Sequence, residues 1–216
     1  MFPRHPNNDV VFCDSSFVET WGEMEKAVDQ GLVKSIGVSN FSEEQIQSIL
    51  DVCRIKPAVN QVECHPYNNQ SKLLEFLSKH DIKITAYSPF GNPGRPFKGT
   101  AKGIRSFQNH KFYIDLDGKN NEVTPVLSHP TIVEIGNKYS KGAGHVLLRY
   151  QIQRGIIVLT KSVNPDRIKS NFDIFNFELD SDDMAKIDAL NQNLRILPLN
   201  WDNIQNHKDY PFKSEL

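Results

Sequence analysis

The sequence predicts an α/β protein built on a parallel sheet, because segments typical of strands alternate with segments typical of helices. Four short runs rich in apolar residues are typical of strands, and they cover residues 34–38, 58–64, 82–87 and 156–160. Most segments around them carry apolar residues three or four positions apart, a spacing typical of amphipathic helices. We therefore expect four parallel strands with helices packed against them.

The helices of the first half have recognisable starts and ends. The first helix is marked by apolar residues at helical spacing: Phe17, Val18, Trp21, Met24 and Val28. Gly31 suits the position after a helix end, and Ser42 with Gln45 forms a capping box that predicts the start of the second helix. A third helix is predicted around 73–77, between the second and third strands.

The second half resumes this alternation after an irregular segment. Helices are predicted around 132–139 and over 145–153, Pro165 opens a helix that reaches Phe172, and Ser181 begins the last one. The irregular segment at about 98–123 has no clear period, so we expect a long loop or insertion there. Loops of this length are usually functional lids or disordered segments, and both alternatives stay open.

Composition places the chain among ordinary soluble globular proteins of one domain. It has 216 residues, of which 38% are hydrophobic and 24% charged, with a net charge of -1. A charge so near zero gives no reason to expect nucleic acid or an anionic membrane as a partner. There is no N-terminal apolar run and no stretch of about 18 apolar residues. The three cysteines are odd in number and widely spaced, so we expect reduced thiols and a cytoplasmic location.

Five segments, taken together, resemble the aldo-keto reductase family. They are Gly31-Leu-Val-Lys-Ser-Ile-Gly-Val-Ser-Asn-Phe41, Asn60-Gln-Val-Glu-Cys-His-Pro-Tyr67, Tyr87-Ser-Pro89, Lys161-Ser-Val163 with Arg167 and Asn171, and His207-Lys-Asp-Tyr-Pro-Phe212. Members of that family fold as (β/α)8, or TIM, barrels of typically about 250 residues. The resemblance implies that the four strands are strands five to eight. Residues 1–216 would then be the C-terminal half of a parallel (β/α)8 barrel, an N-terminally truncated domain with a loop insertion at about 98–123.

The resemblance implies NADPH as cofactor and assigns the nicotinamide to the first three strand ends. Ser39, Asn40 and Gln61 would bond its carboxamide, which offers donors and an acceptor. Tyr87 would stack on one ring face and leave the other free for hydride transfer. Two plainer interpretations remain: Ser39 and Asn40 only turn the chain before the capping box, and Tyr87 is a core residue.

The resemblance assigns the rest of the cofactor to two loops. In the first, Ser88, Phe90 and Asn92 fall where the family covers the pyrophosphate. In the second, the residues implied as contacts of the 2′-phosphate and adenosine are Lys161, Ser162, Val163, Asn164, Arg167 and Asn171. An isolated dianion suits a point charge, a hydroxyl donor and a guanidinium fork, and the first turn of a helix adds backbone N–H groups. The plain alternative is two solvated basic residues on a surface helix.

We assign no catalytic residue and no metal ligand. The family uses an Asp, Tyr, Lys and His tetrad from the first half of the barrel, and His5, Tyr67 and Tyr150 match none of its positions. His65 has no second pair of ligands at metal-site spacing.

Three functional hypotheses remain. In the first, the full-length parent reduces a small-molecule aldehyde or ketone to an alcohol with NADPH. In the second, the chain is a non-catalytic relative that binds NADPH or a protein partner, and in the third it is a degraded product without function. A half-barrel exposes two strand edges, through which the chain could associate with itself.

Overall fold

A computed structural model describes residues 3–7, 9–91, 124–197, 199 and 203–213, and the backbone of two short strands at 112–114 and 120–122. The α-helices are α1 Phe17–Asp29, α2 Glu43–Leu50, α3 Ser71–Lys79, α4 Pro130–Lys138, α5 Ala143–Gln153, α6 Pro165–Ser170 and α7 Ser181–Asp188. The strands are β1 Val38–Ser39, β2 Val59–Glu63, β3 Lys83–Tyr87, β4 Phe112–Ile114, β5 Asn120–Glu122 and β6 Ile157–Val158. Two 3-10 turns are η1 Val126–Ser128 and η2 Ile204–Asn206.

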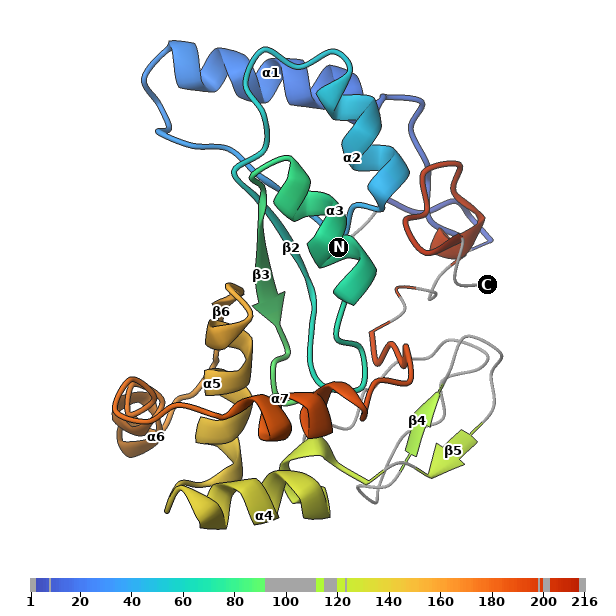
Figure 1. The fold of residues 1–216 in the computed structure, drawn as a ribbon. Helices are drawn as coiled ribbons and strands as arrows, with labels where there is room; N and C mark the ends of the chain where they lie inside the picture. The colour runs from blue at the N-terminus through green and yellow to red at the C-terminus, as the bar shows by residue number, and fades with distance from the viewer. Residues whose placement is uncertain are drawn as a thin grey trace.

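Four strands form one sheet in the order β1-β2-β3-β6, and every neighbouring pair is parallel. The predicted parallel α/β fold is therefore confirmed. Since all four strands point the same way, their carboxyl ends meet at one edge, which lies at the lower end of the β3 arrow in Figure 1. The register places Ser39 opposite Gln61 and Glu63 opposite Tyr87, so polar residues from three strands become neighbours there.

The outer strands are shorter than predicted. Residues 34–38 were expected in the first strand and 156–160 in the fourth, but β1 and β6 contain only two residues each. In the described part of the chain, each of these strands pairs on one side only, β1 with β2 and β6 with β3. The central strands β2 and β3 pair on both sides and keep five residues each.

The segment at about 98–123, expected to be a long loop or insertion, contains two short strands. Strands β4 and β5 pair antiparallel, with Phe112 opposite Glu122. The sequence signal is Asp117-Gly118 between them, a dipeptide typical of hairpin turns. The remaining residues of this segment lie outside the described ranges, so the choice between a lid and a disordered segment stays open.

The helix signals in the first half are confirmed. Ser42 and Gln45 form the predicted capping box at the start of α2, and Gly31 follows α1 with a φ of 69°. Gly37, just before β1, has a different role. A Cβ there would lie 2.7 Å from Val59 Cγ2 and 2.8 Å from the Val59 carbonyl oxygen, so the approach of β1 to β2 excludes any side chain.

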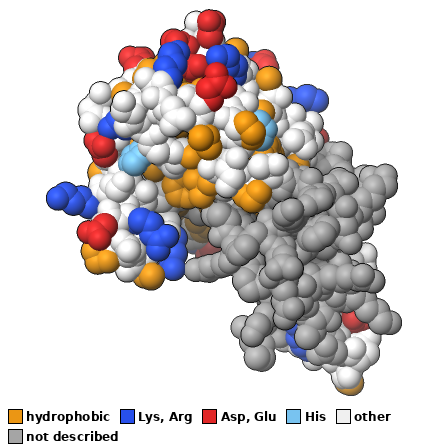
Figure 2. All heavy atoms as spheres, turned by 90° about the horizontal axis from the view of Figure 1, so that it is seen from below, with side chains coloured by type: hydrophobic (Ala, Val, Ile, Leu, Met, Phe, Trp, Pro, Cys, Tyr) orange, Lys and Arg blue, Asp and Glu red, His pale blue; other side chains and the backbone are white. Residues whose placement is uncertain are grey.

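Two apolar clusters hold the helices against the sheet. One lies between β2, β3, α2 and α3 and includes Ile46, Val62, Leu77 and Ile84. The other lies among α4, α5 and α7 and includes residues such as Ile132. Figure 1 shows α3 beside β2 and β3, with α4 and α7 near the carboxyl edge. Seen from below, apolar side chains gather near the middle of the described surface, with charged ones at its periphery (Figure 2).

The segment after α7 returns along the carboxyl edge towards the start of the chain (Figure 1). Leu194 N donates to the Tyr67 carbonyl oxygen at 2.9 Å, which attaches the segment near the end of β2. Further along, Gln45 Nε2 donates to the Asp209 carbonyl oxygen at 2.9 Å, and Val10 N donates to Asn203 Oδ1 at 3.2 Å. None of the helices in the described part is both long and apolar enough to cross a membrane.

Candidate functional site

The ends of β1 and β2 bring together the three residues predicted to bind a carboxamide. Ser39 Oγ donates to the Gln61 carbonyl oxygen at 2.9 Å, and Asn40 N donates to the same oxygen at 2.9 Å. Asn40 has a φ of 58°, a left-handed conformation that asparagine tolerates better than most residues. These bonds use backbone atoms of Gln61, and no described residue bonds its side-chain amide. That amide is therefore available to a ligand.

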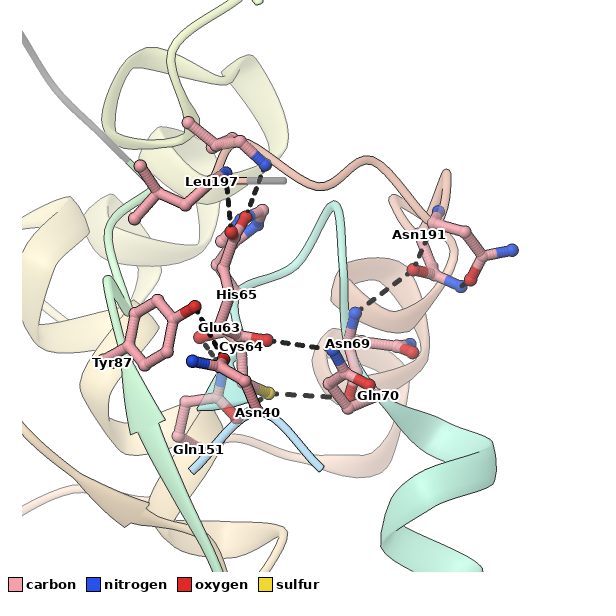
Figure 3. A network of polar contacts seen from close by, with 12 residues as sticks. Asn40, Glu63, Cys64, His65, Asn69, Gln70, Tyr87, Gln151, Asn191 and Leu197 are labelled. Carbon is pink, nitrogen blue, oxygen red and sulfur yellow. Dashed lines mark hydrogen bonds and ion pairs between the residues drawn. The ribbon is translucent and has the colours of Figure 1, made fainter. Parts of the chain in front are cut away.

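Tyr87, at the end of β3, lies opposite Asn40. Its hydroxyl donates to Asn40 Oδ1 at 2.9 Å, so the ring is held at its outer end (Figure 3). Burial raises the pKa of Tyr87 to about 12, and the negative charge of Glu63 acts in the same direction. The phenol is therefore neutral at physiological pH. The half-buried ring suits both predicted roles, as a stacking surface and as part of the core.

The loop after β3 contains the next three predicted contacts. Ser88 has a φ of 50°, which turns the chain sharply away from the sheet. Phe90 is half-buried and packs against the cluster of α4 and α5; a Cβ on Gly144 would lie 3.7 Å from it. Phe90 is thus a packing residue, whatever else it contacts. Asn92 lies outside the described residues.

The segment from Lys161 to Asn171 follows β6 and includes α6. Asn164 caps this helix, with Oδ1 accepting from Arg167 N at 3.0 Å, and its own N–H donates to Ser162 Oγ at 3.1 Å. Asn171 Nδ2 donates to Thr160 Oγ1 at 3.1 Å and fastens the far end of α6 to the end of β6. One expectation is corrected here: the N–H of Arg167 is already bonded to Asn164, so it is not free for an anion.

The basic side chains of this segment differ from most others in the molecule. Lys161 and Arg167 are exposed, and no described residue forms an ion pair or hydrogen bond with either side chain. Elsewhere, Lys138 Nζ lies 2.5 Å from Asp180, Lys141 Nζ lies 2.7 Å from Asp173, and Arg54 bonds Asp29. Lys169, in the same segment, is also exposed and has no such partner among the described residues. Three uncompensated cations close in sequence fit an anionic ligand, and they fit the alternative of solvated surface residues as well. Val163, between Lys161 and Arg167, is 79% exposed.

The sequence reasoning missed Glu63, a buried carboxylate at the end of β2. Oε1 accepts from Ile196 N at 2.6 Å and lies 2.8 Å from His65 Nε2, and Oε2 accepts from Leu197 N at 2.8 Å (Figure 3). Burial alone would raise the pKa of Glu63. The bond and charge of His65, the Ile196 N–H and the charge of Arg195 outweigh it and hold the pKa below its usual value. The one signal in the sequence was a carboxylate in an otherwise buried strand.

His65 and two tyrosines have structural partners. His65 is fully buried against Glu63, and no group of three potential metal ligands occurs among the residues that the structure describes. Tyr67 donates to the Thr124 carbonyl oxygen at 2.7 Å, and Tyr150 donates to Asp188 Oδ1 at 2.5 Å. Burial strongly raises the pKa of Tyr150, so it stays protonated. All three cysteines are free thiols.

The structure is that of an α/β protein with a parallel sheet, and polar side chains meet at the carboxyl ends of its strands, the edge at which proteins of this class commonly bind ligands. Comparison with known proteins specifies the class. The model of the aldo/keto reductase family matches residues 5–192. The chain therefore belongs to the aldo/keto reductase family.

Individual relatives cover the same stretch. The chain is 39% identical to "Aldo-keto reductase family 1 member A1-A" of Danio rerio, over 91% of this chain and 54% of that protein. It is 40% identical to "Aldo-keto reductase family 1 member C4" of Homo sapiens, over 99% of this chain and 60% of that protein. The solved structure of the aldose reductase from Schistosoma japonicum superposes with a TM-score of 0.81 at 36% identity, covering 100% of this chain and 60% of that one. The chain thus spans little more than half the length of these relatives.

Proposed function

We propose that the carboxyl edge of this sheet binds NADPH, and that the full-length protein uses it to reduce aldehydes or ketones to alcohols. One observation carries the proposal. Ser39, Asn40, Gln61 and Tyr87 come from three strands and lie together at one edge, joined by hydrogen bonds. Membership of the aldo/keto reductase family supports the same ligand, and the resemblance of the strand-end segments to that family assigns these four residues to it.

We also propose that the four strands are strands five to eight of a (β/α)8 barrel. The order β1-β2-β3-β6 supports this, because each strand lies beside the next strand of the parallel series, as in a barrel wall. The superposition on the Schistosoma enzyme, with all of this chain matching 60% of that one, is consistent with a partial barrel. In that arrangement the carboxyl ends of the strands face the active site.

The nicotinamide end of the site is formed by Asn40, Gln61 and Tyr87. The Gln61 amide and the Asn40 Nδ2 group can bond a primary carboxamide, since Asn40 uses only Oδ1 to hold Tyr87. The bond to Asn40 keeps the Tyr87 ring in place, so it can cover one face of a flat ligand. NADPH, when bound, supplies the hydride, and a covered face would leave the opposite face towards the carbonyl substrate.

The adenosine end is formed by the segment around α6. Lys161 and Arg167 supply two exposed charges for the 2′-phosphate, and Ser162 adds a hydroxyl donor. Asn164 and Asn171 shape the segment through their bonds to Arg167 N and Thr160 Oγ1. We assign no proton donor to this chain, because the family's catalytic tetrad belongs to the first half of the barrel and Tyr67 and Tyr150 match none of its positions.

The stacking role of Tyr87 is tested by two substitutions of different size. Tyr87→Phe keeps the ring and loses only the bond to Asn40, whereas Tyr87→Ala removes the stacking surface. Stacking of roughly 0.5–1.5 kcal/mol predicts that the alanine variant binds NADPH about 2–10-fold more weakly than the phenylalanine variant. Titration followed by NADPH fluorescence measures this. Equal affinities in the two variants would show that Tyr87 is a core residue only.

A turnover assay separates the reductase from the non-catalytic alternative. A reactive aldehyde and NADPH are mixed with the protein, and the loss of nicotinamide absorbance is followed. NADPH-dependent formation of alcohol supports the reductase. NADPH binding without turnover in the full-length protein favours the non-catalytic relative.

We further propose that the chain associates with a second copy through the outer strands of the sheet. In the described residues β1 and β6 each have one paired side, and Ile157 and Leu159 are 45% and 48% exposed. Open edges promote association, and a lysine there opposes it. Leu159→Lys should shift sedimentation towards the monomer, whereas Leu32→Lys, at an exposed site on another part of the surface, should not. The same species distribution in both variants contradicts this.

A further inference from the structure

The carboxylate of Glu63 joins two parts of the chain that lie far apart in sequence. Its donors include the backbone N–H groups of Ile196 and Leu197, at 2.6 Å and 2.8 Å, and these residues follow Glu63 by 133 and 134 positions. The third donor is His65 Nε2 at 2.8 Å. The side chains of Glu63 and His65 are both 0% exposed, so water does not replace any of these partners at the surface.

The buried negative charge of Glu63 is stable only because of the groups bonded to it. Moving a carboxylate out of water is costly unless hydrogen bonds and opposite charges compensate it. Two of the three hydrogen bonds to Glu63 come from the C-terminal segment, so the charge is stabilised mainly while that segment is in place. The segment is also attached nearby through Leu194 N, which donates to the Tyr67 carbonyl oxygen at 2.9 Å.

The attached segment borders the candidate site. Arg195 lies between Leu194 and Ile196, whose backbone N–H groups are both bonded; its guanidinium carbon lies 3.6 Å from the centroid of the Phe212 ring, and its positive charge favours the ionised form of both Glu63 and Tyr87. Figure 3 shows Leu197 above Glu63, on the same side of the sheet edge as Tyr87. The segment therefore forms a boundary beside the proposed stacking residue.

We infer that Glu63 is a positioning residue, which fixes the segment 194–197 against the end of β2 so that this segment forms a wall of the pocket for the carbonyl substrate. The part of this inference that concerns the substrate rests on the proposed function. The anchoring itself rests only on the bonds described above. In the described residues the side chain of Glu63 forms no hydrogen bond with a proposed NADPH contact, but Glu63 lies opposite Tyr87 in the register of β2 and β3. The Kd of NADPH is therefore measured beside the kinetics to separate the two effects.

Glutamine is the sharpest replacement for Glu63, because it is nearly the same size. An amide has one acceptor oxygen and an NH2 group that can only donate. It can accept from Ile196 N or from Leu197 N, and its NH2 group then faces a second donor. Glu134→Gln, at an exposed site on α4, is the matched control.

Amide hydrogen exchange tests the anchor directly. In the wild type, Ile196 N and Leu197 N should exchange at least about tenfold more slowly than the N–H of the exposed Asn193, which donates to the side chain of the half-buried Asn191. In Glu63→Gln both should accelerate at least about tenfold, with no change at Ile84 in the core. Glu134→Gln should change none of them. Acceleration at Ile84 as well would indicate general destabilisation and would refute a local anchor.

Other outcomes are equally decisive. Unchanged exchange at both amides in folded Glu63→Gln overturns the anchor. If Glu63→Gln does not fold, the exchange rates of the wild type decide. Ile196 N and Leu197 N exchanging as fast as Asn193 N would then contradict the anchor.

Enzyme kinetics test the part of the inference that concerns the substrate pocket. In the full-length protein, Glu63→Gln should raise KM for a reactive aldehyde at least about fivefold, while kcat and the Kd of NADPH change less than about twofold. An unchanged KM refutes the positioning role. If the wild type neither binds NADPH nor turns over substrate, the proposed function is wrong, and so is the part of this inference that concerns the substrate. The hydrogen-exchange result would still show whether Glu63 anchors the segment 194–197.

Discussion

Two regions of the same sheet edge are built in opposite ways. In the middle, at the ends of β2 and β3, Glu63 and His65 are buried and bonded to each other and to the C-terminal segment. At the side of β6, Lys161, Val163 and Arg167 face solvent, and no described side chain pairs with the two charges. Folding therefore determines the middle of the edge, while the β6 side keeps charges that a ligand can use. Substitutions of the buried Glu63 should therefore affect stability more than those of Lys161 and Arg167, which should affect mainly binding.

The largest effect is expected from Glu63→Ala. The substitution leaves two backbone N–H groups and His65 without an acceptor in a buried place, which should lower the free energy of unfolding by about 3–5 kcal/mol. Urea denaturation followed by circular dichroism measures it. Glu134→Ala on the exposed face of α4 should stay within about 0.5 kcal/mol of the wild type. A loss below about 1 kcal/mol for Glu63→Ala would contradict the account of the middle region.

A core substitution in the same region comes next. Ile84 in β3 is 0% exposed, and Ile84→Ala should cost about 2–5 kcal/mol, since it removes buried contacts and leaves a cavity. Val163→Ala, on the β6 side, should change stability by no more than about 0.5 kcal/mol. The same denaturation curves measure both. Similar losses in the two variants would erase the difference between the regions.

Acid should weaken the middle region in particular. The pKa of Glu63 in the folded protein lies below its ordinary value of 4.5, so its contribution is present above that value and is lost as pH falls through the folded pKa. The wild type should therefore lose more stability between neutral pH and pH about 4 than Glu63→Gln does, because the variant has no carboxylate to protonate. If the free energy of unfolding changes with pH in the same way in both proteins, protonation of Glu63 does not cause the loss of stability in acid.

The smallest stability effect is expected at the cap of α6. Asn164→Ala removes the acceptor for Arg167 N and should cost about 0.5–2 kcal/mol. Because Asn164 also orders the segment that carries Arg167, the NADPH affinity should fall as well, which calorimetric titration measures. Asn176→Ala, where the side chain bonds only the exposed Asp173, is the control. A change in stability without a change in affinity would separate α6 from the cofactor.

The sequence predicted what local patterns encode. The four strands, the capping box at Ser42 and the turn at Gly31 follow from spacing and residue type over a few positions, and the structure confirms them. The short lengths of β1 and β6 could not be predicted from local patterns, because the length of a strand also depends on how many other strands pair with it. The hairpin of β4 and β5 had only one local signal, Asp117-Gly118, within an irregular segment.

The same distinction between local patterns and distant contacts applies to the residues of the candidate site. Ser39, Asn40, Gln61 and Tyr87 were singled out by resemblance, and the structure brings them together, but their ligand remains a prediction. The partners of Glu63 left no trace in the sequence, because bonds to backbone N–H groups more than a hundred positions away impose no residue type. Asn164 was predicted to contact the cofactor, and its observed bonds are those of a helix cap.

The preference of the protein for NADPH over NADH tests the central claim most directly. Calorimetric titration gives the Kd of both cofactors for the wild type and for the double variant Lys161→Ala, Arg167→Ala. Charge-assisted bonds of roughly 1.5–3 kcal/mol predict that the wild type binds NADPH about 10–100-fold more tightly, and that the double variant loses this preference while its Kd for NADH stays within about twofold. Equal wild-type affinities for the two cofactors, or a preference that survives in the double variant, would contradict the assignment of the 2′-phosphate to the β6 side of the sheet.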